Sequence, residues 1–340
     1  MFAKIIMLFR KVVWLSVLPV IFAAPAPSVD CTTYTTTEIT TVETSYFVVN
    51  SVPARDTFNN STYPIFSCEN YFDTINEFSC HNTSAVPACE SCCFEDYGIL
   101  LQAQSWDYNP DYLSIAVNGT QQDKDAIEGN STIMNPSDPA QRAFTIHGLW
   151  NDLCDGSYNQ YCNPSLEISD AKDNITRVLV DEFGQKDLYD YMIKFWVNNV
   201  KSNVPNGGSI SLWEHEYNKH GTCMNTLLPS CFTGEYTRFE NTVYFYKKVV
   251  ELYQNVQTQT FLAESGIVPT VTKQYRLSDV IDAIAKNNAG KQVYVGCLNG
   301  AIDEIWYYYN LKGNVLTGDY KPIELTTKQG CPQNVWYIPK

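Results

Sequence analysis

The stretch FTIHGLWND at residues 144–152 begins with the alternation of apolar and polar side chains that is typical of a β-strand. A second stretch, SLWEHEYNKHGTC at residues 211–223, carries its ionisable residues at spacings that bring them together on a helix. The two stretches hold three of the four histidines of the 340-residue chain. The residues that are best able to carry chemistry are therefore concentrated in one strand and one helix.

The second stretch predicts a helix with one reactive side. Ser211 and Glu214 are spaced as in a capping box, which predicts a helix start at Ser211, and Gly221 is a residue type that often ends helices. Successive helical residues are about 100° apart, so Glu214 points away from a group that shares less than half of the circumference. This group consists of His215, Glu216, Lys219 and His220.

Three other interpretations of these residues are open at this point. A row of charges often marks a helix that simply faces solvent, although two imidazoles, a carboxylate and an ammonium on one side are costly unless they are solvated or used. A zinc-protease helix requires histidines four residues apart, and His215 and His220 are five apart. A lone strand histidine such as His147 is often structural, but Trp150 and Asp152, if exposed, would be able to stack on a base and bind its edge.

The rest of the chain predicts a single α+β domain. Strands are expected at 97–106, 144–147, 292–297 and 304–311, helices at 170–183, 187–200 and 239–254, and a surface loop at 118–142. Helices and strands do not alternate regularly, and no glycine-rich phosphate-binding motif is present, which favours α+β over a doubly wound fold. We therefore expect a central antiparallel β-sheet flanked by helices in a domain that covers residues 67–340.

The N-terminal region predicts entry into the secretory pathway. Residues 1–24 have a basic start, an apolar run and a small-residue exit, as in a signal peptide, and residues 25–66 form a Thr-rich polar spacer. No later apolar run is long enough for a membrane anchor in the mature chain. We expect a secreted protein, or alternatively one in a vacuole lumen, with glycans on the sequons at Asn59, Asn60, Asn82, Asn118, Asn130 and Asn174.

Composition supports an oxidising compartment and limits the class of binding protein. The chain has 12 cysteines, an even number, and Cys92 and Cys93 are adjacent, so each is expected to tie a different segment. Only the pair Cys89 and Cys92 has zinc-finger spacing, which leaves zinc as the less favoured alternative to disulfides. The formal net charge of -14 excludes a general nucleic-acid binder, because phosphate neutralisation needs clustered cations.

Both stretches resemble the paired active-site motifs of the ribonuclease T2 family, T-[I/L]-H-G-L-W-x-D and W-x-H-E-x-x-K-H-G-T-C. The similarity extends from about Ser67 to the region of Cys331. It implies an endoribonuclease with His220 as the base, His147 as the acid, Glu216 and Lys219 as stabilisers of the transition state, and His215 as a phosphate ligand. The residues implied to bind the base upstream of the cut are Trp150, Asp152 and Tyr158.

The resemblance also implies the reaction and the disulfide bonds. The reaction would use the 2′-hydroxyl of single-stranded RNA, with low base specificity and without a metal ion or other cofactor, and would leave DNA intact; we expect a monomer. The implied disulfides are Cys68–Cys93, Cys80–Cys154, Cys92–Cys231, Cys162–Cys223 and Cys297–Cys331. Cys31 and Cys89 fall outside this set and could pair with each other.

The sequence departs from the family pattern at three positions: Asn151 stands for a usual Pro, Tyr217 for a usual Trp, and Leu212 for an aromatic residue. Only the last bears on function, because it puts the preference for the downstream base in doubt. Two rival hypotheses are a secreted binding or signalling glycoprotein and a metal-dependent hydrolase. Since His147, Glu216, Lys219 and His220 are all present, the sequence favours an enzyme.

Overall fold

The computed structural model describes residues 63–65, 68, 77–81, 92–95, 98–198 and 208–340. All of them belong to one compact unit, residues 46–340. The predicted signal peptide, most of the spacer, Cys31, Cys89 and three sequon asparagines lie outside the described residues. These asparagines are Asn59, Asn60 and Asn82.

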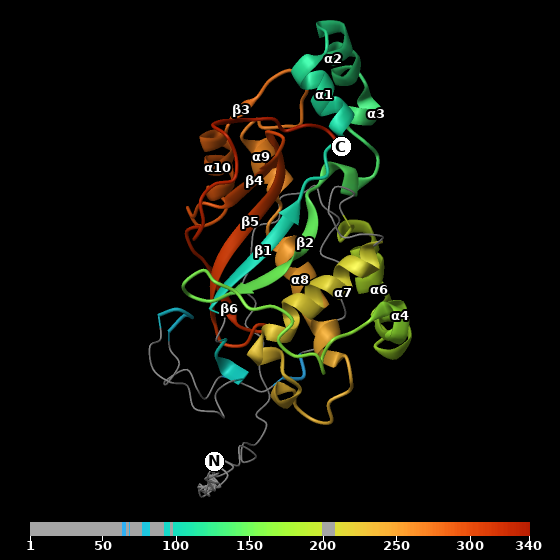
Figure 1. Cartoon of the computed structure of the whole chain (residues 1–340), viewed down its shortest axis with the longest axis vertical. Coiled ribbons are helices and arrows are strands. Elements are labelled where there is room, and N and C mark those ends of the chain that lie inside the picture. Colours follow the sequence, from blue (N-terminus) through green and yellow to red (C-terminus); the bar gives the residue numbers. More distant parts are fainter. Residues whose placement is uncertain (1–62, 66–67, 69–76, 82–91, 96–97, 199–207) are drawn as a thin grey trace, which may run out of the picture. The chain divides into compact units, whose positions relative to one another are not determined.

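A central antiparallel sheet confirms the predicted fold class (Figure 1). Its strands have the order β2-β1-β5-β4, and β6 pairs with a further part of β5. The strands are β1 (Ile99–Ser105), β2 (Thr145–Asp152), β4 (Tyr294–Leu298), β5 (Ala301–Lys312) and β6 (Asp319–Pro322), and a separate two-stranded ribbon joins β3 (Tyr275–Arg276) to β7 (Asn334–Val335). Since β2 is an edge strand of the path, its free side is open to contact with a helix.

The α-helices precede and follow the sheet strands without regular alternation. They are α1 (Pro110–Asn118), α2 (Gln121–Glu128), α3 (Ser131–Met134), α4 (Asp170–Asp173), α5 (Ile175–Arg177), α6 (Lys186–Phe195), α7 (Ser209–Lys219), α8 (Glu240–Asn255), α9 (Thr258–Glu264) and α10 (Leu277–Ala285). None of the helices in the described ranges is long and apolar enough to cross a membrane.

The helix α8 covers one face of the sheet and forms the larger core with it. Leu100 and Leu149 from the sheet are buried in the same cluster as Val249 and Val250 of α8. Strand side chains alternate between two faces, so the neighbours of these residues emerge on the opposite face. There Leu101 and Tyr308 form a smaller buried cluster, with Trp150 and Trp306 packed at its margin.

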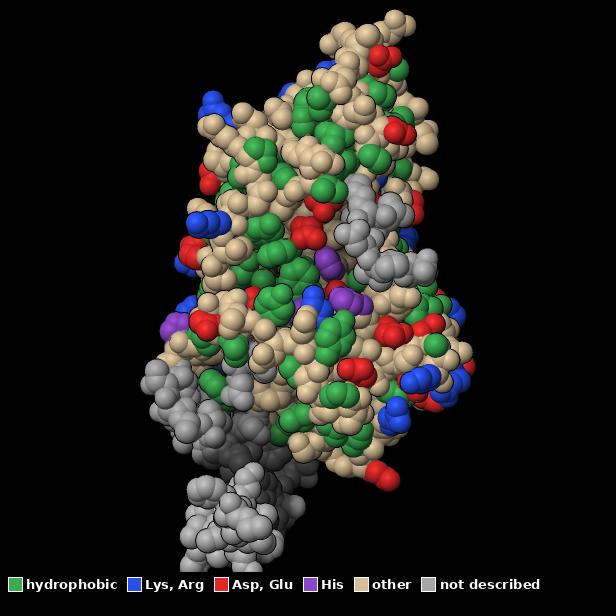
Figure 2. All heavy atoms as spheres, viewed as in Figure 1, with side chains coloured by type: hydrophobic (Ala, Val, Ile, Leu, Met, Phe, Trp, Pro, Cys, Tyr) green, Lys and Arg blue, Asp and Glu red, His purple; other side chains and the backbone are tan. Residues whose placement is uncertain are grey.

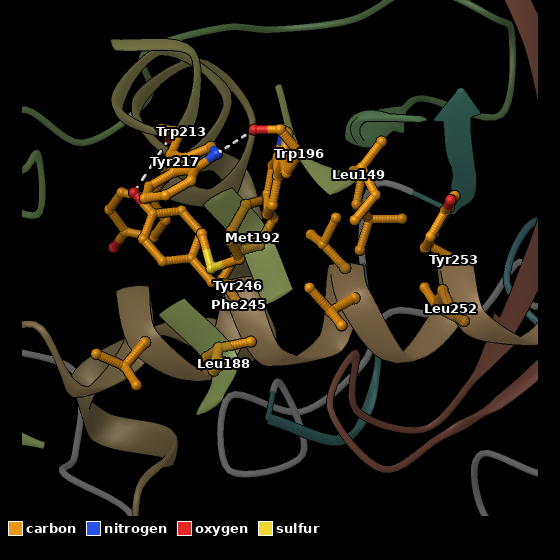
Figure 3. Packing of buried hydrophobic residues seen from close by; sticks show 14 of the residues in the cluster. Leu149, Leu188, Met192, Trp196, Trp213, Tyr217, Phe245, Tyr246, Leu252 and Tyr253 are labelled. Atoms are coloured by element: carbon orange, nitrogen blue, oxygen red, sulfur yellow. Dashed lines mark hydrogen bonds between the residues drawn. The ribbon is translucent and has the colours of Figure 1, made fainter. Parts of the chain in front are cut away.

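Aromatic packing fixes α7 against α6 and α8 (Figure 3). The Trp213 indole donates a 2.8 Å hydrogen bond to the carbonyl of Trp196, and the Tyr246 hydroxyl donates to the carbonyl of Trp213. The Trp196 indole in turn donates to the carbonyl of His147 at 2.8 Å. Burial of these rings therefore fixes the position of α7 relative to the strand that carries His147.

The segment 118–142 is helical, so the predicted surface loop is wrong there. The polar residues that suggested a loop are helix caps. Thr120 and Asp123 form a reciprocal capping box that starts α2, and Asn130 accepts a hydrogen bond from Thr132 at the start of α3. Asp138 similarly caps a 3₁₀ turn. Asn and Asp are common in both loops and caps, and this ambiguity misled the prediction.

The predicted capping box at Ser211 is also wrong. The helix α7 begins at Ser209 after Gly208, and the carboxylate of Glu214 accepts a hydrogen bond from the backbone of Asp170 at 2.8 Å. Glu214 nevertheless points away from the ionisable group, as its helical position requires. The helix ends at Lys219, and a 3₁₀ turn starts at Gly221.

Two other predicted helices are shorter than expected. The segment 170–183 is divided into α4, α5 and a π-helical turn, because Asn174 adopts a left-handed backbone conformation between the first two. The helix predicted at 187–200 ends at Phe195, since Trp196 leaves the helical conformation to bury its ring. The helix predicted at 239–254 is α8.

The structure contains the five disulfides that the resemblance implied, from Cys68–Cys93 to Cys297–Cys331. Cys92 is bonded to Cys231, which overturns a zinc site built on Cys89 and Cys92. Residues 63–65, assigned to the spacer by composition, contact the domain: Tyr63 donates a hydrogen bond to Glu251. Residues that precede the expected start of the domain at 67 therefore contribute to its packing.

Candidate active site

A β-bulge presents His147 at the open edge of the sheet. Gly148 pairs with Ala103 and Ile146 pairs with Gln104, so His147 is the extra residue in β2. A bulge changes the direction of a side chain relative to regular alternation. The ring of His147 lies between two carboxylates: Nε2 is 3.5 Å from Glu216 Oε1, and Nδ1 is 3.5 Å from Glu304 Oε1.

Glu216 is the buried centre of the site. Its side chain is 1% exposed and accepts a 2.8 Å hydrogen bond from the indole of Trp150, in addition to its contact with His147. A Cβ atom at residue 148 would lie 2.0 Å from Glu216 Oε2, so only glycine at that position leaves room for the carboxylate. The edge strand and α7 thus meet through Glu216.

His220 closes the site at the end of α7. Its ring stacks on Trp150 with centroids 5.6 Å apart, and the residue is 4% exposed. Neither ring nitrogen has a hydrogen-bond partner within the described ranges. A buried polar atom is normally paired, so these nitrogens are suited to a group that arrives with the substrate.

The surroundings of His147 and His220 favour opposite protonation states of the two imidazoles. Burial by itself lowers the pKa of His147, but the carboxylates of Glu216 and Glu304 outweigh it and raise that pKa well above its ordinary value. Burial lowers the pKa of His220, and the charges of Lys219 and His147 add to this effect against the opposing charge of Glu216. His147 is therefore held protonated and His220 neutral.

The same charges act on the buried carboxylate. Burial by itself raises the pKa of Glu216, but the positive charge and hydrogen bonding of His147 lower it below its ordinary value, and His220 and His215 add to this effect only when they are protonated. An ionised Glu216 therefore faces a protonated His147 across 3.5 Å. A pair of opposite charges in a buried position stabilises both charged forms.

His215 and Lys219 lie beside this centre on α7, as their helical positions predict. His215 Nδ1 is 3.2 Å from the hydroxyl of Tyr161. The backbone of Tyr161 is left-handed, with φ 52°, and its amide donates to the carbonyl of Lys219. The next residue, Cys162, forms a disulfide with Cys223, and this bond fixes the loop against the end of α7.

The residues expected to bind the upstream base differ in exposure. Trp150 is partly exposed, and its indole contacts Glu216, His220 and Trp306. Asp152 lies at the end of β2, where burial raises its pKa to about 6. Tyr158 is 58% exposed, and its side chain is free to meet a ligand from solvent.

Figure 2 shows histidine and basic side chains beside acidic ones near the middle of one face, with hydrophobic side chains next to them. The chemistry and the geometry now agree with one family. The ribonuclease T2 family model matches residues 97–320, more than half of the chain, and includes every residue described in this site. The chain belongs to the ribonuclease T2 family.

Curated members of the T2 family cover most of the chain. It is 40% identical over 265 residues to Ribonuclease T2 of Aspergillus oryzae, covering 77% of this chain and 82% of that protein. It is 37% identical over 252 residues to Ribonuclease M of Aspergillus phoenicis, covering 74% and 91%. The chain spans about half of the length of Ribonuclease T2-like 1-A of Candida albicans, with 40% identity over 246 residues, 72% of this chain and 53% of that protein.

A solved T2 structure has the same fold. The crystal structure of Actibind, described as a T2 ribonuclease, superposes with a TM-score of 0.62 at 35% identity and covers 78% of this chain and 95% of that chain. The family match and the named relatives establish the chain as an endoribonuclease. The resemblance seen in the two motifs is thereby confirmed.

Motif-based reasoning in this T2 chain did not identify Glu304, Trp306 or Tyr161. Glu304 and Trp306 lie on β5, far in sequence from both motifs; the pairing of β5 with β1 brings Glu304 to His147, and Trp306 contacts Glu304. Tyr161 lies three residues after Tyr158, but only its left-handed backbone turns it towards His215. No local pattern distinguishes these residues from ordinary strand and loop residues.

Replacing Tyr161 by phenylalanine tests whether its hydroxyl orients His215. We expect a few-fold increase in KM for RNA with little change in kcat, because one exposed hydrogen bond contributes about 0.5–1.5 kcal/mol. Steady-state kinetics on an oligoribonucleotide would measure it, with Tyr112→Phe, a substitution on α1, as a matched control. Unchanged KM in Tyr161→Phe would show that the hydroxyl has no such role.

Proposed function

We propose that this endoribonuclease cleaves single-stranded RNA by internal transesterification, with His220 as the base and His147 as the acid. The observation that carries the proposal is that the surroundings raise the pKa of His147 and lower the pKa of His220. Glu216 and Glu304 favour a protonated His147, whereas burial and neighbouring positive charges favour a neutral His220. A general acid must begin with its proton and a general base without one, so each ring starts in the form that the reaction requires.

In the proposed step, His220 accepts the proton of the ribose 2′-hydroxyl, and the 2′-oxygen forms a bond to the adjacent phosphorus. The bond between phosphorus and the 5′-oxygen breaks, and that oxygen takes the proton of His147. The products are a 2′,3′-cyclic phosphate and a 5′-hydroxyl, and water then opens the ring to a 3′-phosphate with the roles of the histidines reversed.

The substrate supplies its own nucleophile in this reaction. The 2′-hydroxyl is already adjacent to the phosphorus, which replaces a bimolecular encounter by an intramolecular one. No metal ion or other cofactor is needed to generate a nucleophile, and DNA is not cleaved because it lacks the 2′-oxygen. The neighbouring cations, Lys219 and His215, are placed to offset the negative charge of the transition state, and Glu216 keeps His147 charged.

The upstream base is expected to lie against Tyr158 and Asp152, with the partly exposed edge of Trp150 beneath it. An exposed tyrosine stacks on any base, which supports low base specificity. Asp152, whose pKa is raised to about 6 by burial, is able to accept or donate a hydrogen bond in the mildly acidic range. Both properties allow one site to accommodate different bases.

Product analysis in excess EDTA tests this proposal. The purified protein is incubated with an oligoribonucleotide and with the same sequence carrying a single 2′-deoxynucleotide at the cut. We expect cleavage to persist in EDTA, to yield 2′,3′-cyclic phosphate ends and to disappear at the deoxynucleotide. Abolition of cleavage by EDTA would instead indicate a metal-dependent hydrolase, and the absence of cleavage would favour a binding protein.

We also propose that the protein follows the secretory route, which leads either to export or to a vacuole lumen. Five disulfides are typical of an oxidising compartment. The sequon asparagines Asn118, Asn130 and Asn174 are all exposed, so each is accessible to a glycosylating enzyme. Loss of mass on treatment with a glycosidase specific for Asn-linked glycans would test the route.

A further inference from the structure

We propose that Glu304 is a positioning residue that holds the general acid, His147, by its Nδ1 atom and directs the Nε2 proton towards the scissile phosphate. The proposal rests on the proposed role of His147. Its basis is the 3.5 Å approach of Glu304 Oε1 to Nδ1, from a strand that neither motif includes. The other nitrogen, Nε2, faces Glu216 and the side of the site where α7 carries Lys219 and His220.

The carboxylate of Glu304 is itself fixed by its neighbour on the same strand. Trp306 follows two residues later, so both side chains emerge on the same face of β5. The Trp306 indole donates a 2.9 Å hydrogen bond to Glu304 Oε2, which leaves Oε1 for His147. One carboxylate thus accepts a hydrogen bond from an indole and forms a 3.5 Å ion pair with an imidazole nitrogen that has no hydrogen-bond partner among the described residues, so the indole sets the direction of the carboxylate.

Trp306 is held between two further rings. The ring of Tyr294, paired with it across β4 and β5, lies 4.1 Å away at 30°, and Trp150 meets it edge-on at 5.0 Å. Contacts on both sides restrict rotation of the indole, so its N–H stays directed at Glu304. The general acid is consequently connected to β4 through Glu304 and Trp306.

Tyr294 also contacts the C-terminal segment. A Cβ atom at Gly330 would lie 2.2 Å from the Tyr294 hydroxyl, so the glycine backbone packs directly on that ring. The amide of Gly330 donates to the carbonyl of Val295, and the next residue, Cys331, is bonded to Cys297. This disulfide therefore holds the segment that supports the whole series of contacts.

Among the described residues, the charged or titratable groups that act on His147 are Glu216, Glu304, His215 and His220. The two carboxylates favour its protonated form, and the two imidazoles oppose that form when they are charged. Removal of the Glu304 charge leaves Glu216 as the only carboxylate among them. The protonated acid is then expected to be lost at a lower pH, and the ring loses the partner that fixes its Nδ1 side.

The test compares wild type, Glu304→Gln and Glu304→Asp in the pH dependence of kcat/KM for a dinucleoside monophosphate. Loss of the acid proton defines the alkaline side of this profile. We expect Glu304→Gln to move the alkaline limb down by about one pH unit, the usual effect of one neighbouring charge. Glu304→Asp keeps the charge and should restore most of the profile, a recovery that a merely structural role would not give.

Two further variants complete the design. Trp306→Phe keeps a ring but removes the N–H that fixes Glu304, so a smaller shift in the same direction is expected. Glu324→Gln removes an exposed carboxylate that pairs with Lys291, and its profile should match wild type. A coincident alkaline limb in Glu304→Gln and wild type would overturn the proposal.

NMR titration of the histidine C2 protons separates this proposal from the proposed function. The chain has four histidines, so the His147 signal can be assigned by its absence in His147→Ala. A lowered pKa of His147 in Glu304→Gln supports the contact whatever the catalytic role of the ring, and an unchanged pKa refutes it. If the contact is present but His147→Ala cleaves RNA normally, the proposed function fails instead.

Discussion

We expect substitution of His220 by alanine to lower kcat for RNA about a thousand-fold, and substitution of His147 to have an effect of similar size. General acid–base groups typically contribute about 10²–10⁴-fold to a rate. Glu216 is a poor substitute for either ring, since it is held between His147 and Trp150 with a lowered pKa. Single-turnover cleavage of an oligoribonucleotide in EDTA would measure both losses.

A substrate with an activated leaving group separates the acid from the base. In a uridine 3′-(4-nitrophenyl phosphate), the departing phenolate is stable without a proton, so the acid is dispensable while the base is still required. We expect His147→Ala to regain most of its activity on this compound and His220→Ala to remain inactive. The reverse pattern would exchange the two roles.

The exposed His81 provides the matched control for these substitutions. It lies outside the site, and its ring contacts the carbonyl of Ser79. His81→Ala should therefore retain wild-type kcat on both substrates. Near-normal cleavage of RNA by His147→Ala or His220→Ala would contradict the two-histidine mechanism.

Replacement of Gly148 by alanine is expected to lower kcat by about a hundred-fold, although no ionisable residue is replaced. The added methyl carbon would lie 2.0 Å from Glu216 Oε2 and 2.7 Å from its carboxyl carbon, so Glu216 must move. The displaced carboxylate then loses its hydrogen bond from Trp150 and its ion pair with His147. Removal of one preorganised group that stabilises a transition state costs about 10²–10³-fold in kcat, and we expect the displacement of Glu216 to have an effect of that order.

The same substitution should destabilise the fold by about 1–3 kcal/mol, the usual cost of overpacking a filled interior. Thermal unfolding measures this cost, and Gly208→Ala is a matched control because no atom of the described residues lies within 4 Å of its added carbon. In the double variant Gly148→Ala, Glu216→Asp, the shorter acid makes room for the methyl group, so stability should recover while kcat stays low. Wild-type kcat in Gly148→Ala would show that Glu216 tolerates displacement.

The residues that the sequence correctly grouped in space are those whose relation is local. His215, Glu216, Lys219 and His220 lie within six residues, so helical geometry alone places them on one side of α7. The strand that carries His147 was also predicted, together with its apolar alternation. Local periodicity is sufficient to group such residues before any tertiary structure is known.

The features that the sequence did not reveal depend on contacts between distant segments. Glu304 reaches His147 because β5 and β2 both pair with β1. Trp150 is covered by the rings of His220, at the end of α7, and Trp306, on β5, and the sequence around Trp150 does not indicate either contact. The bulge at His147 is likewise invisible in the alternation, because it arises from pairing with Ala103 and Gln104. Tertiary packing decided these positions and overrode local pattern.

The buried ring of His220 is needed for the proposed activity but lowers the stability of the fold. Its two nitrogens have no partner within the described residues, and an unpaired buried polar atom costs free energy that an apolar ring of similar shape would not. Phenylalanine at this position would make a more stable and inert protein. An RNA phosphate or ribose that forms a hydrogen bond with the ring recovers part of that cost, so bound substrate should stabilise the fold. Selection for heat resistance alone would therefore favour replacement of His220 and loss of activity.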